Sequence, residues 1–376
     1  MLFESYFLAR KKKRKSFSQI SFEVNFEKNI FDLYQEIISK KYIQESSNCF
    51  IINKPVKREI FAASFRDRVV HHFIFKILNP LIEKKLLYDV YSCRKGKGTF
   101  FGVDRATSAM QSISDNFKKD AYVLKLDISG YFMNINKDIL YHKVMNLIDK
   151  NEIDLPIQSN LIKYLVKVNI YNSPTDNCRF RCGKSQWKGL PDNKSLFKTP
   201  FNCGLAIGNL TSQLYGNLYL SDFDHYVKKE LQIKKYGRYV DDLYFFDNDR
   251  LFLASVINSV KKRLFHVEKL ELHPKKIYLQ NVKNGFLFLG IYILPYRRYI
   301  GKRIKKGLYN SLNKINQNDD VSLKELERKL LVFQSYCSIL KHYNCFKLLR
   351  NLKFVYLPFV LSKCNYKNVN IPFLKT

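Results

Sequence analysis

The stretch RYVDDLYFF, residues 238–246, places two adjacent carboxylates between two runs of strand-forming residues. It predicts a tight β-hairpin with Asp241 and Asp242 at the turn. Hairpin turns favour Asn-Gly or Asp-Gly, and two like charges repel, so Asp-Asp is a poor choice for a turn alone. One interpretation is a solvated acidic turn. The other is a site for a hard divalent cation such as Mg²⁺, which takes oxygen ligands.

A further carboxylate fits the cation interpretation. The segment AYVLKLDIS, residues 121–129, predicts a short apolar strand that runs to Asp127. Two-metal phosphoryl transfer needs carboxylates that converge from separate elements and hold metals about 3.5–4 Å apart. Asp127 beside the hairpin would provide this arrangement, although a strand-end Asp can also be a simple cap. Phe132 is either an ordinary core residue or a ring beneath an incoming sugar that excludes a 2′-hydroxyl.

The composition indicates a large, basic protein with a polyanionic partner. The 376 residues are 46% hydrophobic, which allows two or three subdomains with buried cores. The 65 Lys and Arg against 33 Asp and Glu give a formal charge of +32. Because 25 Tyr and 30 Phe are interleaved with these charges, nucleic acid is favoured over a membrane.

Other classes are disfavoured. No apolar run reaches the roughly 18 residues of a membrane span, and no signal peptide pattern is present. We therefore expect a cytoplasmic protein with reduced cysteines. Cys178, Cys182 and Cys203 lack a fourth ligand with zinc-like spacing, so we expect no zinc site.

The apolar spacing along the chain predicts several elements. The segment 58–86 should begin as a strand and continue as a helix that stops at Pro80, and 286–293 should form a strand pair. The segment 170–203 should be an irregular insertion. Helices are expected at 27–41, 139–168, 208–231 and 250–265, and again after Arg303.

Several motifs resemble those of reverse transcriptases and occur in the same order as in the palm of that family. They are LDISGYF (126–132), GLAIGNLTSQLYGNLYL (204–220), YVDD (239–242), LELHPKKI (270–277) and GFLFLGIYI (285–293). Upstream, REIFAASFRDRVVHH (58–72) and SCRKGKGTF (92–100) resemble the finger motifs.

The resemblance implies an α+β right-hand polymerase with fingers, a palm built on an antiparallel sheet, and a helical thumb. Residues 1–119 would form an N-terminal arm and fingers, and 120–296 the palm, with about 146–203 returning to the fingers or forming an insertion. Residues 297–376 would form the thumb. The implied activity is that of an RNA-directed DNA polymerase, a nucleotidyltransferase.

The subtype also has a sequence signal. Most reverse transcriptases carry Gln before the glycine of the motif that precedes YVDD, whereas this chain has Ile207 within IGNLTSQ. In this respect it resembles the reverse transcriptases of diversity-generating retroelements, as do WKGLPDNKSLF (187–197) and CRKGKGT (93–99). Ala206 departs from the proline that is usual in that family, which puts the rigidity of this loop in doubt.

This subtype implies mutagenic retrohoming. A template-repeat RNA is copied into cDNA with errors mainly at adenines, and the cDNA diversifies a target gene. The resemblance further implies a small, oligomeric, basic accessory protein as partner, no membrane, and a cytoplasmic enzyme encoded by a bacterium, an archaeon or a phage.

The resemblance assigns roles by motif position. Asp127, Asp241, Asp242 and the carbonyl of Ile128 would bind two Mg²⁺ ions, with Mn²⁺ as a possible substitute, and Lys276 would protonate the leaving pyrophosphate. The expected contacts to the deoxynucleotide come from Arg58, helped by Lys54 or Lys57, and from Ile128, Phe132, Ile207 and Gln213. The expected contacts to RNA and primer come from Arg94, Lys97 and Tyr239.

Alternatives remain at this point. One is another bacterial reverse transcriptase, of the retron or group II intron type. The IGNLTSQ motif disfavours a retron enzyme, and the short chain after the expected thumb disfavours an intron enzyme. The other is a catalytically silent RNA-binding protein on a polymerase scaffold, which the intact acids disfavour.

Overall fold

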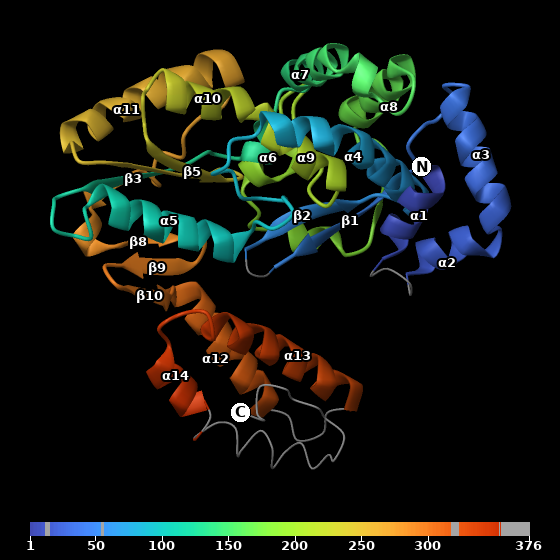
Figure 1. Cartoon of the computed structure of the whole chain (residues 1–376). Coiled ribbons are helices and arrows are strands. Elements are labelled where there is room, and N and C mark those ends of the chain that lie inside the picture. The colour runs from blue at the N-terminus through green and yellow to red at the C-terminus, as the bar shows by residue number, and fades with distance from the viewer. Residues whose placement is uncertain (12–15, 54–55, 317–322, 353, 355–376) are drawn as a thin grey trace. The chain divides into compact units, whose positions relative to one another are not determined.

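The computed structural model describes residues 1–11, 16–53, 56–316, 323–352 and 354 (Figure 1). Lys54 lies outside these residues. The helices are α1 (Leu2–Arg10), α2 (Phe17–Val24), α3 (Phe26–Ile38), α4 (Phe65–Lys85), α5 (Thr99–Ile113), α6 (Tyr131–Asn134), α7 (Lys137–Lys150), α8 (Ser159–Tyr171), α9 (Leu210–Tyr219), α10 (Ser221–Lys229), α11 (Arg250–Arg263), α12 (Lys302–Asn316), α13 (Leu323–Leu340) and α14 (Phe346–Asn351). The strands are β1 (Ser47–Ile52), β2 (Arg58–Ala62), β3 (Tyr122–Asp127), β4 (Cys178–Phe180), β5 (Lys235–Tyr239), β6 (Asp242–Asp247), β7 (Tyr278–Asn281), β8 (Phe286–Phe288), β9 (Ile291–Leu294) and β10 (Arg297–Ile300).

These elements pack into two compact units. The first contains residues 1–98, 124–247 and 251–279, and the second contains residues 99–123, 248–250 and the described part of 280–376. This division follows packing and does not test the predicted bounds of fingers, palm and thumb, which stay a prediction.

The first unit contains a small sheet in the order β2-β1-β4. In it, β1 pairs antiparallel with β2 and parallel with β4. Helix α4 packs against α1 and α9, and its buried face is continuous from Phe65 to Ile82. Its first turn is capped by Ser64, whose hydroxyl accepts a hydrogen bond from the backbone amide of Asp67 at 3.1 Å.

The four-stranded sheet has the order β5-β6-β3-β7, with α10 and α11 over one face (Figure 1). The second unit has its own sheet in the order β10-β9-β8, with antiparallel pairing, and α12 packs along α13. The mixture of helices and antiparallel strands confirms the α+β prediction.

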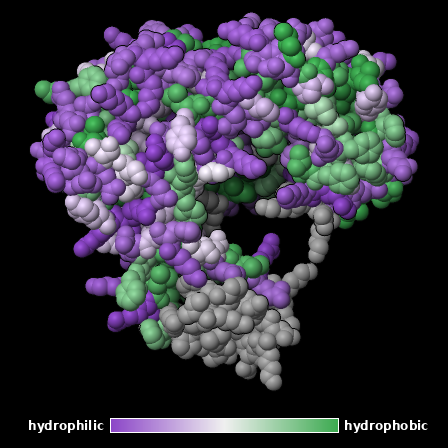
Figure 2. Space-filling model, viewed as in Figure 1, coloured by the Kyte–Doolittle hydropathy of each residue, from purple (hydrophilic) through white to green (hydrophobic). Residues whose placement is uncertain are grey.

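The surface is largely hydrophilic on the face that Figure 2 shows, with apolar side chains gathered over the N-terminal helices. These include Phe7 on α1, Phe17 on α2 and Phe31 on α3, which are 60%, 82% and 58% exposed. Within the part of the chain that the structure describes, no helix is long and apolar enough to cross a membrane.

Three predicted elements differ from the structure. Helix α4 continues through Pro80 to Lys85, because Ile77 and Leu78 before the proline and Leu81 and Ile82 after it are all buried. The segment 139–168 forms two helices, α7 and α8. The segment 208–231 also forms two, α9 and α10, which separate at Leu220; there Ser221 Oγ donates to the carbonyl of Leu218 at 2.8 Å in place of a continued helical bond.

A buried ion pair joins α10 to the hairpin of β5 and β6. Arg238 on β5 and Asp224 on α10 are both inaccessible to solvent, and Nη2 of Arg238 lies 2.6 Å from Oδ2 of Asp224. The same carboxylate accepts hydrogen bonds from Nε of Arg238 at 2.7 Å and from the hydroxyl of Tyr236 at 2.6 Å. The guanidinium also donates to the carbonyls of Asn217 and Val240, each at 3.2 Å. It therefore ties the hairpin turn to two helices.

Replacement of Arg238 by Met should destabilise the protein strongly. The variant leaves the carboxylate of Asp224 buried without its cation, and such a loss costs about 3–5 kcal/mol. Chemical denaturation measures the free energy of unfolding. The control is Lys283→Met, which removes the exposed partner of Asp120 and should have little effect. An Arg238→Met variant as stable as this control would show that the pair does not hold the hairpin.

Candidate active site

The hairpin turn lies one residue earlier than predicted. Tyr239 on β5 pairs with Asp242 on β6, so Val240 and Asp241 form the turn and Asp242 begins the strand. Val240 has a φ of +59°, which is uncommon for a β-branched residue and costs on the order of 1–3 kcal/mol. The contact of its carbonyl with Arg238 helps to stabilise this conformation.

Backbone hydrogen bonds bring the strand end of β3 beside this turn. The amide of Ile128 donates to the carbonyl of Asp241 at 3.1 Å. On the other side, the amide of His273 donates to the carbonyl of Asp127 at 2.8 Å. The end of β3 is thus held between the hairpin turn and the 271–276 segment, which carries Lys276.

Two lysines offset the negative charge of the three acids. Nζ of Lys276 donates to both carboxylate oxygens of Asp127, at 2.9 and 3.0 Å. Nζ of Lys125 lies 3.2 Å from Oδ1 of Asp242. Lys125 was not among the residues predicted from the sequence, although the two-residue period of a strand places it on the same face of β3 as Asp127.

The acids influence one another electrostatically. Burial and the nearby charge of Asp127 raise the pKa of Asp241 to about 6, while the charges of Lys276 and Arg58 oppose the shift. Burial raises the pKa of Asp242 to about 7; Lys125 opposes this, and the charges of Asp241 and Asp127 add to it. The three carboxyl groups therefore lie close enough to share one electrostatic environment.

The donor set fits a hard divalent cation. Oδ1 of Asp242 is buried and has no hydrogen bond of good geometry among the described residues; its ion-pair contact with Nζ of Lys125 is 3.2 Å long. A cation would compensate this oxygen and would lower the raised pKa values. Among the described residues, no three or more His, Cys, Asp or Glu side chains are positioned so that together they could hold a metal ion. The predicted roles of the three acids and of the Ile128 carbonyl as ligands stay a prediction.

Phe132 and Ile207 come together as parts of one apolar cluster. Both pack against a buried group that includes Phe61, Leu196 and Ala206. The amide of Phe61 donates to the carbonyl of Ile207 at 3.0 Å, and the amide of Leu205 donates to that of Phe132 at 2.8 Å. Phe132 and Ile207 are half-buried, so each presents part of its side chain outside the cluster.

Strand β2 and the residue before it carry basic side chains predicted to contact the nucleotide. Arg58 is exposed, and its charge acts to lower the pKa of Asp241, against the larger effect of burial. Nζ of Lys57 donates to the carbonyl of Lys188 at 2.7 Å, which ties the start of this strand to the 170–203 insertion. Gln213 is exposed on α9 and accepts a hydrogen bond from the thiol of Cys93 at 3.1 Å.

The predicted RNA and primer residues have mixed positions. The guanidinium of Arg94 is bound by Glu83, with Nη2 2.7 Å from its carboxylate, and by the carbonyls of Leu87 and Val90. Its side chain is only 8% exposed, a geometry that favours a structural role over a template contact. Lys97 donates to the carbonyl of Tyr88 and lies 4.2 Å from the centroid of its ring.

Tyr239, predicted to lie beside the primer end, is half-buried at the end of β5, immediately before the hairpin turn. This position places its backbone opposite Asp242. A contact with the primer stays a prediction.

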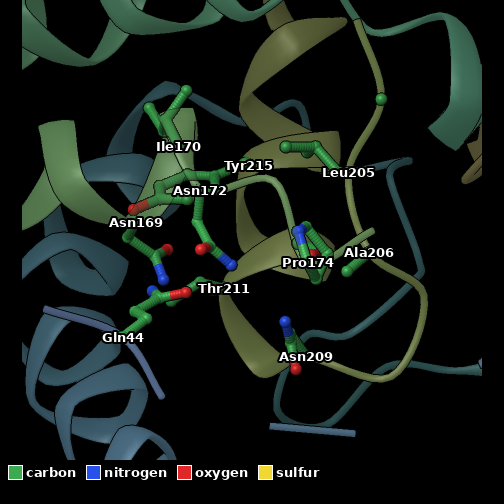
Figure 3. Close-up of a pocket in the computed structure, with 12 residues that line it drawn as sticks. Gln44, Asn169, Ile170, Asn172, Pro174, Leu205, Ala206, Asn209, Thr211 and Tyr215 are labelled. Atoms are coloured by element: carbon green, nitrogen blue, oxygen red, sulfur yellow. The ribbon is translucent and has the colours of Figure 1, made fainter. Parts of the chain in front are cut away.

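A small polar cavity lies on the other side of the loop that carries Ile207. Figure 3 shows the amide groups of Gln44, Asn169 and Asn172 directed toward a common space, with Tyr215 beside them. Its volume of about 20 Å³ suits one or two water molecules. The hydroxyl of Tyr215 and Nε2 of Gln44 are buried without a partner among the described residues, and such water would satisfy them.

The titration of the acids should be visible in the stability of metal-free protein. Between about pH 4 and pH 7 the unfolded chain loses protons that folded Asp241 and Asp242 retain. The contribution of the two acids to the free energy of unfolding therefore falls as pH rises through this window. Asp242→Asn removes one titrating group. The free energy of unfolding of this variant, relative to that of the wild type, should therefore rise by on the order of 3 kcal/mol from pH 4 to pH 7.

Urea unfolding in the presence of a chelator measures this difference. Asp32→Asn, at an exposed position on α3, should follow the wild type at every pH. Parallel stability curves for wild type and Asp242→Asn would show that Asp242 titrates normally.

Comparison with known proteins gives a family match. Residues 52–293, more than half of the chain, match the family described as reverse transcriptase (RNA-dependent DNA polymerase). No curated protein matched the sequence.

Among solved structures, a telomerase from Candida albicans in complex with a TWJ fragment of telomeric RNA is similar with a TM-score of 0.50 at 13% identity; the match covers 88% of this chain and 64% of that chain. An apo telomerase from Candida tropicalis gives a TM-score of 0.48 at 13% identity, covering 89% and 62%. The chain thus spans less than two thirds of the length of these telomerases. The similarity to the Candida albicans structure supports the right-hand polymerase fold, and the family match shows that the chain belongs to the reverse transcriptase family, the RNA-dependent DNA polymerases.

Proposed function

We propose that this chain synthesises DNA on an RNA template and that Asp127, Asp241 and Asp242 are its catalytic acids. The observation that carries the proposal is the convergence of these carboxylates from β3 and the hairpin, where burial and mutual repulsion raise the pKa values of Asp241 and Asp242. Membership of the reverse transcriptase family supplies the reaction class. A silent RNA-binding scaffold has no need of three half-buried, mutually repelling acids.

The acids and the carbonyl of Ile128 would hold two Mg²⁺ ions, or Mn²⁺ in their place. When bound, such ions activate the primer hydroxyl and neutralise the leaving pyrophosphate. The residues of the chain then perform defined tasks. Arg58 attracts the triphosphate of the nucleotide toward Asp241, and Phe132 sits under its sugar. Lys276 carries its proton next to Asp127 and transfers it to the leaving pyrophosphate.

A basic cavity offers a path for RNA. Its volume is about 500 Å³, and it is lined by Lys11, Arg68, His71 and His72 together with residues 208–210 at the start of α9. Among the residues that the structure describes, no acidic side chain lines it. Burial lowers the pKa of His71 to about 3, so this ring is neutral, and neither ring nitrogen has a partner in the described residues. We place template phosphates here, with the net charge of +32 supplying the long-range attraction.

Asp241→Asn should abolish DNA synthesis and leave the protein folded. The amide keeps the size of the side chain at the turn but removes a negative charge that a cation requires. Primer extension on an RNA template with Mg²⁺ measures the activity, and circular dichroism checks the fold. Asp154→Asn, at an exposed position 61% open to solvent, is the matched control and should extend the primer normally. Wild-type synthesis by Asp241→Asn would contradict the assignment of the acids.

Within the family, we propose the diversity-generating subtype, in which a template-repeat RNA is copied with errors mainly at adenines. Ile207 supports this proposal, because it packs with Phe132 in the cluster beside the expected nucleotide site. An amide at this position could hydrogen-bond near the sugar, whereas an isoleucine offers only apolar contact. Correct and incorrect pairs should therefore differ less in binding free energy. The selectivity for adenine rests on the resemblance alone.

Ile207→Gln should lower misincorporation opposite template adenine more than opposite the other bases. A gain of about 1.4 kcal/mol in discrimination reduces errors about tenfold. Sequencing of cDNA made by both forms on one RNA measures the effect. Ile207→Leu, which keeps an apolar side chain of the same size, should retain the wild-type error spectrum. Equal adenine errors in Ile207→Gln and wild type, with synthesis preserved, would make Ile207 a packing residue only.

The proposed partners follow from the same subtype. They are a template-repeat RNA, its cDNA, and a small, oligomeric, basic accessory protein that selects the RNA, all in the cytoplasm. Synthesis by the lone chain should be weak or unselective and should become template-specific on co-expression. Full, template-specific synthesis by the lone chain would contradict the need for an accessory protein.

A further inference from the structure

Glu59 is a buried carboxylate that binds the insertion between α8 and α9. It lies on β2 next to Arg58 and is only 1% exposed. Its Oε2 accepts hydrogen bonds from Nε1 of Trp187 at 2.6 Å and from the hydroxyl of Ser195 at 2.9 Å. Its Oε1 accepts one from the amide of Leu196 at 2.6 Å. The part of the chain that the structure describes offers Glu59 no Lys or Arg partner within ion-pair distance, so these three donors compensate its burial.

The far side of the same insertion touches the proposed catalytic site. A Cβ atom added to Gly130 would lie only 2.7 Å from the carbonyl oxygen of Asn193, and Gly130 has a φ of +53°. Nδ2 of Asn193 donates to Oγ of Ser129 at 3.3 Å. The insertion therefore contacts the turn that links Asp127 to Phe132, and only glycine fits at position 130.

The insertion also supports the apolar side of the nucleotide site. Leu196 belongs to the cluster against which Phe132, Ile207 and Trp187 pack. A side-chain atom of Leu196 would lie 2.6 Å from a Cβ on Gly204, at the start of the loop that carries Ile207. A shift of Leu196 would therefore change the packing of both Phe132 and Ile207.

We propose that Glu59 is a positioning residue of the nucleotide site, acting through the insertion rather than by touching the substrate. The proposal rests on the proposed function. The carboxylate fixes Trp187 and Leu196 to strand β2. This keeps Asn193 against the turn at 129–130 and keeps Leu196 in the cluster against which Phe132 and Ile207 pack. A loosened insertion lowers the fraction of molecules with a competent pocket. The apparent nucleotide affinity falls by that fraction, whereas a saturating nucleotide restores the competent form.

Glu59→Gln is the informative variant. It preserves volume but supplies one acceptor oxygen and a donor NH₂ in place of two acceptors. Ser195 can rotate its hydroxyl, but the indole of Trp187 and the amide of Leu196 cannot become acceptors. One buried donor therefore loses its partner. We expect the KM for the deoxynucleotide to rise about tenfold, with kcat changed less than twofold.

A second substitution should rescue this variant. Trp187→Phe removes the indole donor, so in Glu59→Gln/Trp187→Phe the remaining oxygen can serve Leu196 and the NH₂ can serve Ser195. The KM of the double variant should lie below that of Glu59→Gln. Asp67→Asn is the matched control. Asp67 is also a buried carboxylate, bound by the hydroxyl of Tyr42 at 2.8 Å and the amide of Glu45 at 2.9 Å, and its loss should lower stability without changing the KM.

Trp187 gives a readout that needs no activity, because it is the single tryptophan of the chain. In Glu59→Gln the indole ring should become more accessible, so acrylamide should quench its fluorescence more strongly than in wild type. In Asp67→Asn the quenching should stay at the wild-type level. If wild type does not extend primers on RNA, the proposed function fails, and unchanged quenching in Glu59→Gln overturns the anchoring role. If wild type is active and Glu59→Gln keeps the wild-type KM, or if Asp67→Asn raises the KM equally, the positioning role is overturned while the proposed function stands.

Discussion

The buried pair of Arg238 and Asp224 is the constraint on which the site depends. Two charges without solvent are costly, and the pair persists because each nitrogen of the guanidinium donates to a carboxylate or a carbonyl. One of these carbonyls belongs to Val240, which adopts a left-handed conformation. The ion pair thus supports a strained turn, and the turn sets the direction of Asp241 and Asp242.

The acids themselves oppose folding in the absence of cations. Burial and mutual repulsion raise their pKa values, so the folded chain retains protons that the unfolded chain releases. Lys125 and Lys276 offset part of this charge from the two sides of the site. A site that is destabilised when empty and relieved by bound cations is consistent with a functional rather than a structural role for these carboxylates.

Local sequence signals predicted much of this architecture. The apolar run before Asp127 predicted β3, and the hydrophobic spacing predicted α3 and α11, because both depend on period and composition. Membership of the reverse transcriptase family was also predicted correctly, because its motifs occur in the family's order along the chain. The turn was misplaced by one residue, because the register of β5 and β6 depends on long-range contacts of Arg238. The prediction that the helix stops at Pro80 was wrong, because the burial of apolar side chains on both sides of the proline outweighs the loss of one backbone hydrogen bond.

The side-chain contacts that support the site could not be predicted, because they join residues far apart in the chain. Glu59 and Trp187 are 128 residues apart in the chain, and nothing in either motif indicates that they meet. Lys125 was within reach of sequence reasoning, because strand periodicity places it beside Asp127. The insertion looked irregular because its order comes from Glu59 and from the apolar cluster, not from helical or strand periodicity.

The most direct test of the account is anomalous X-ray diffraction from crystals of the chain bound to an RNA template, a DNA primer and a deoxynucleotide, grown with Mn²⁺. The account predicts manganese peaks in contact with the carboxylates of Asp127 and of the hairpin acids, with Lys276 released from Asp127. Manganese bound only elsewhere, with the nucleotide in place and Lys276 still on Asp127, would contradict the assignment of these acids to the reaction.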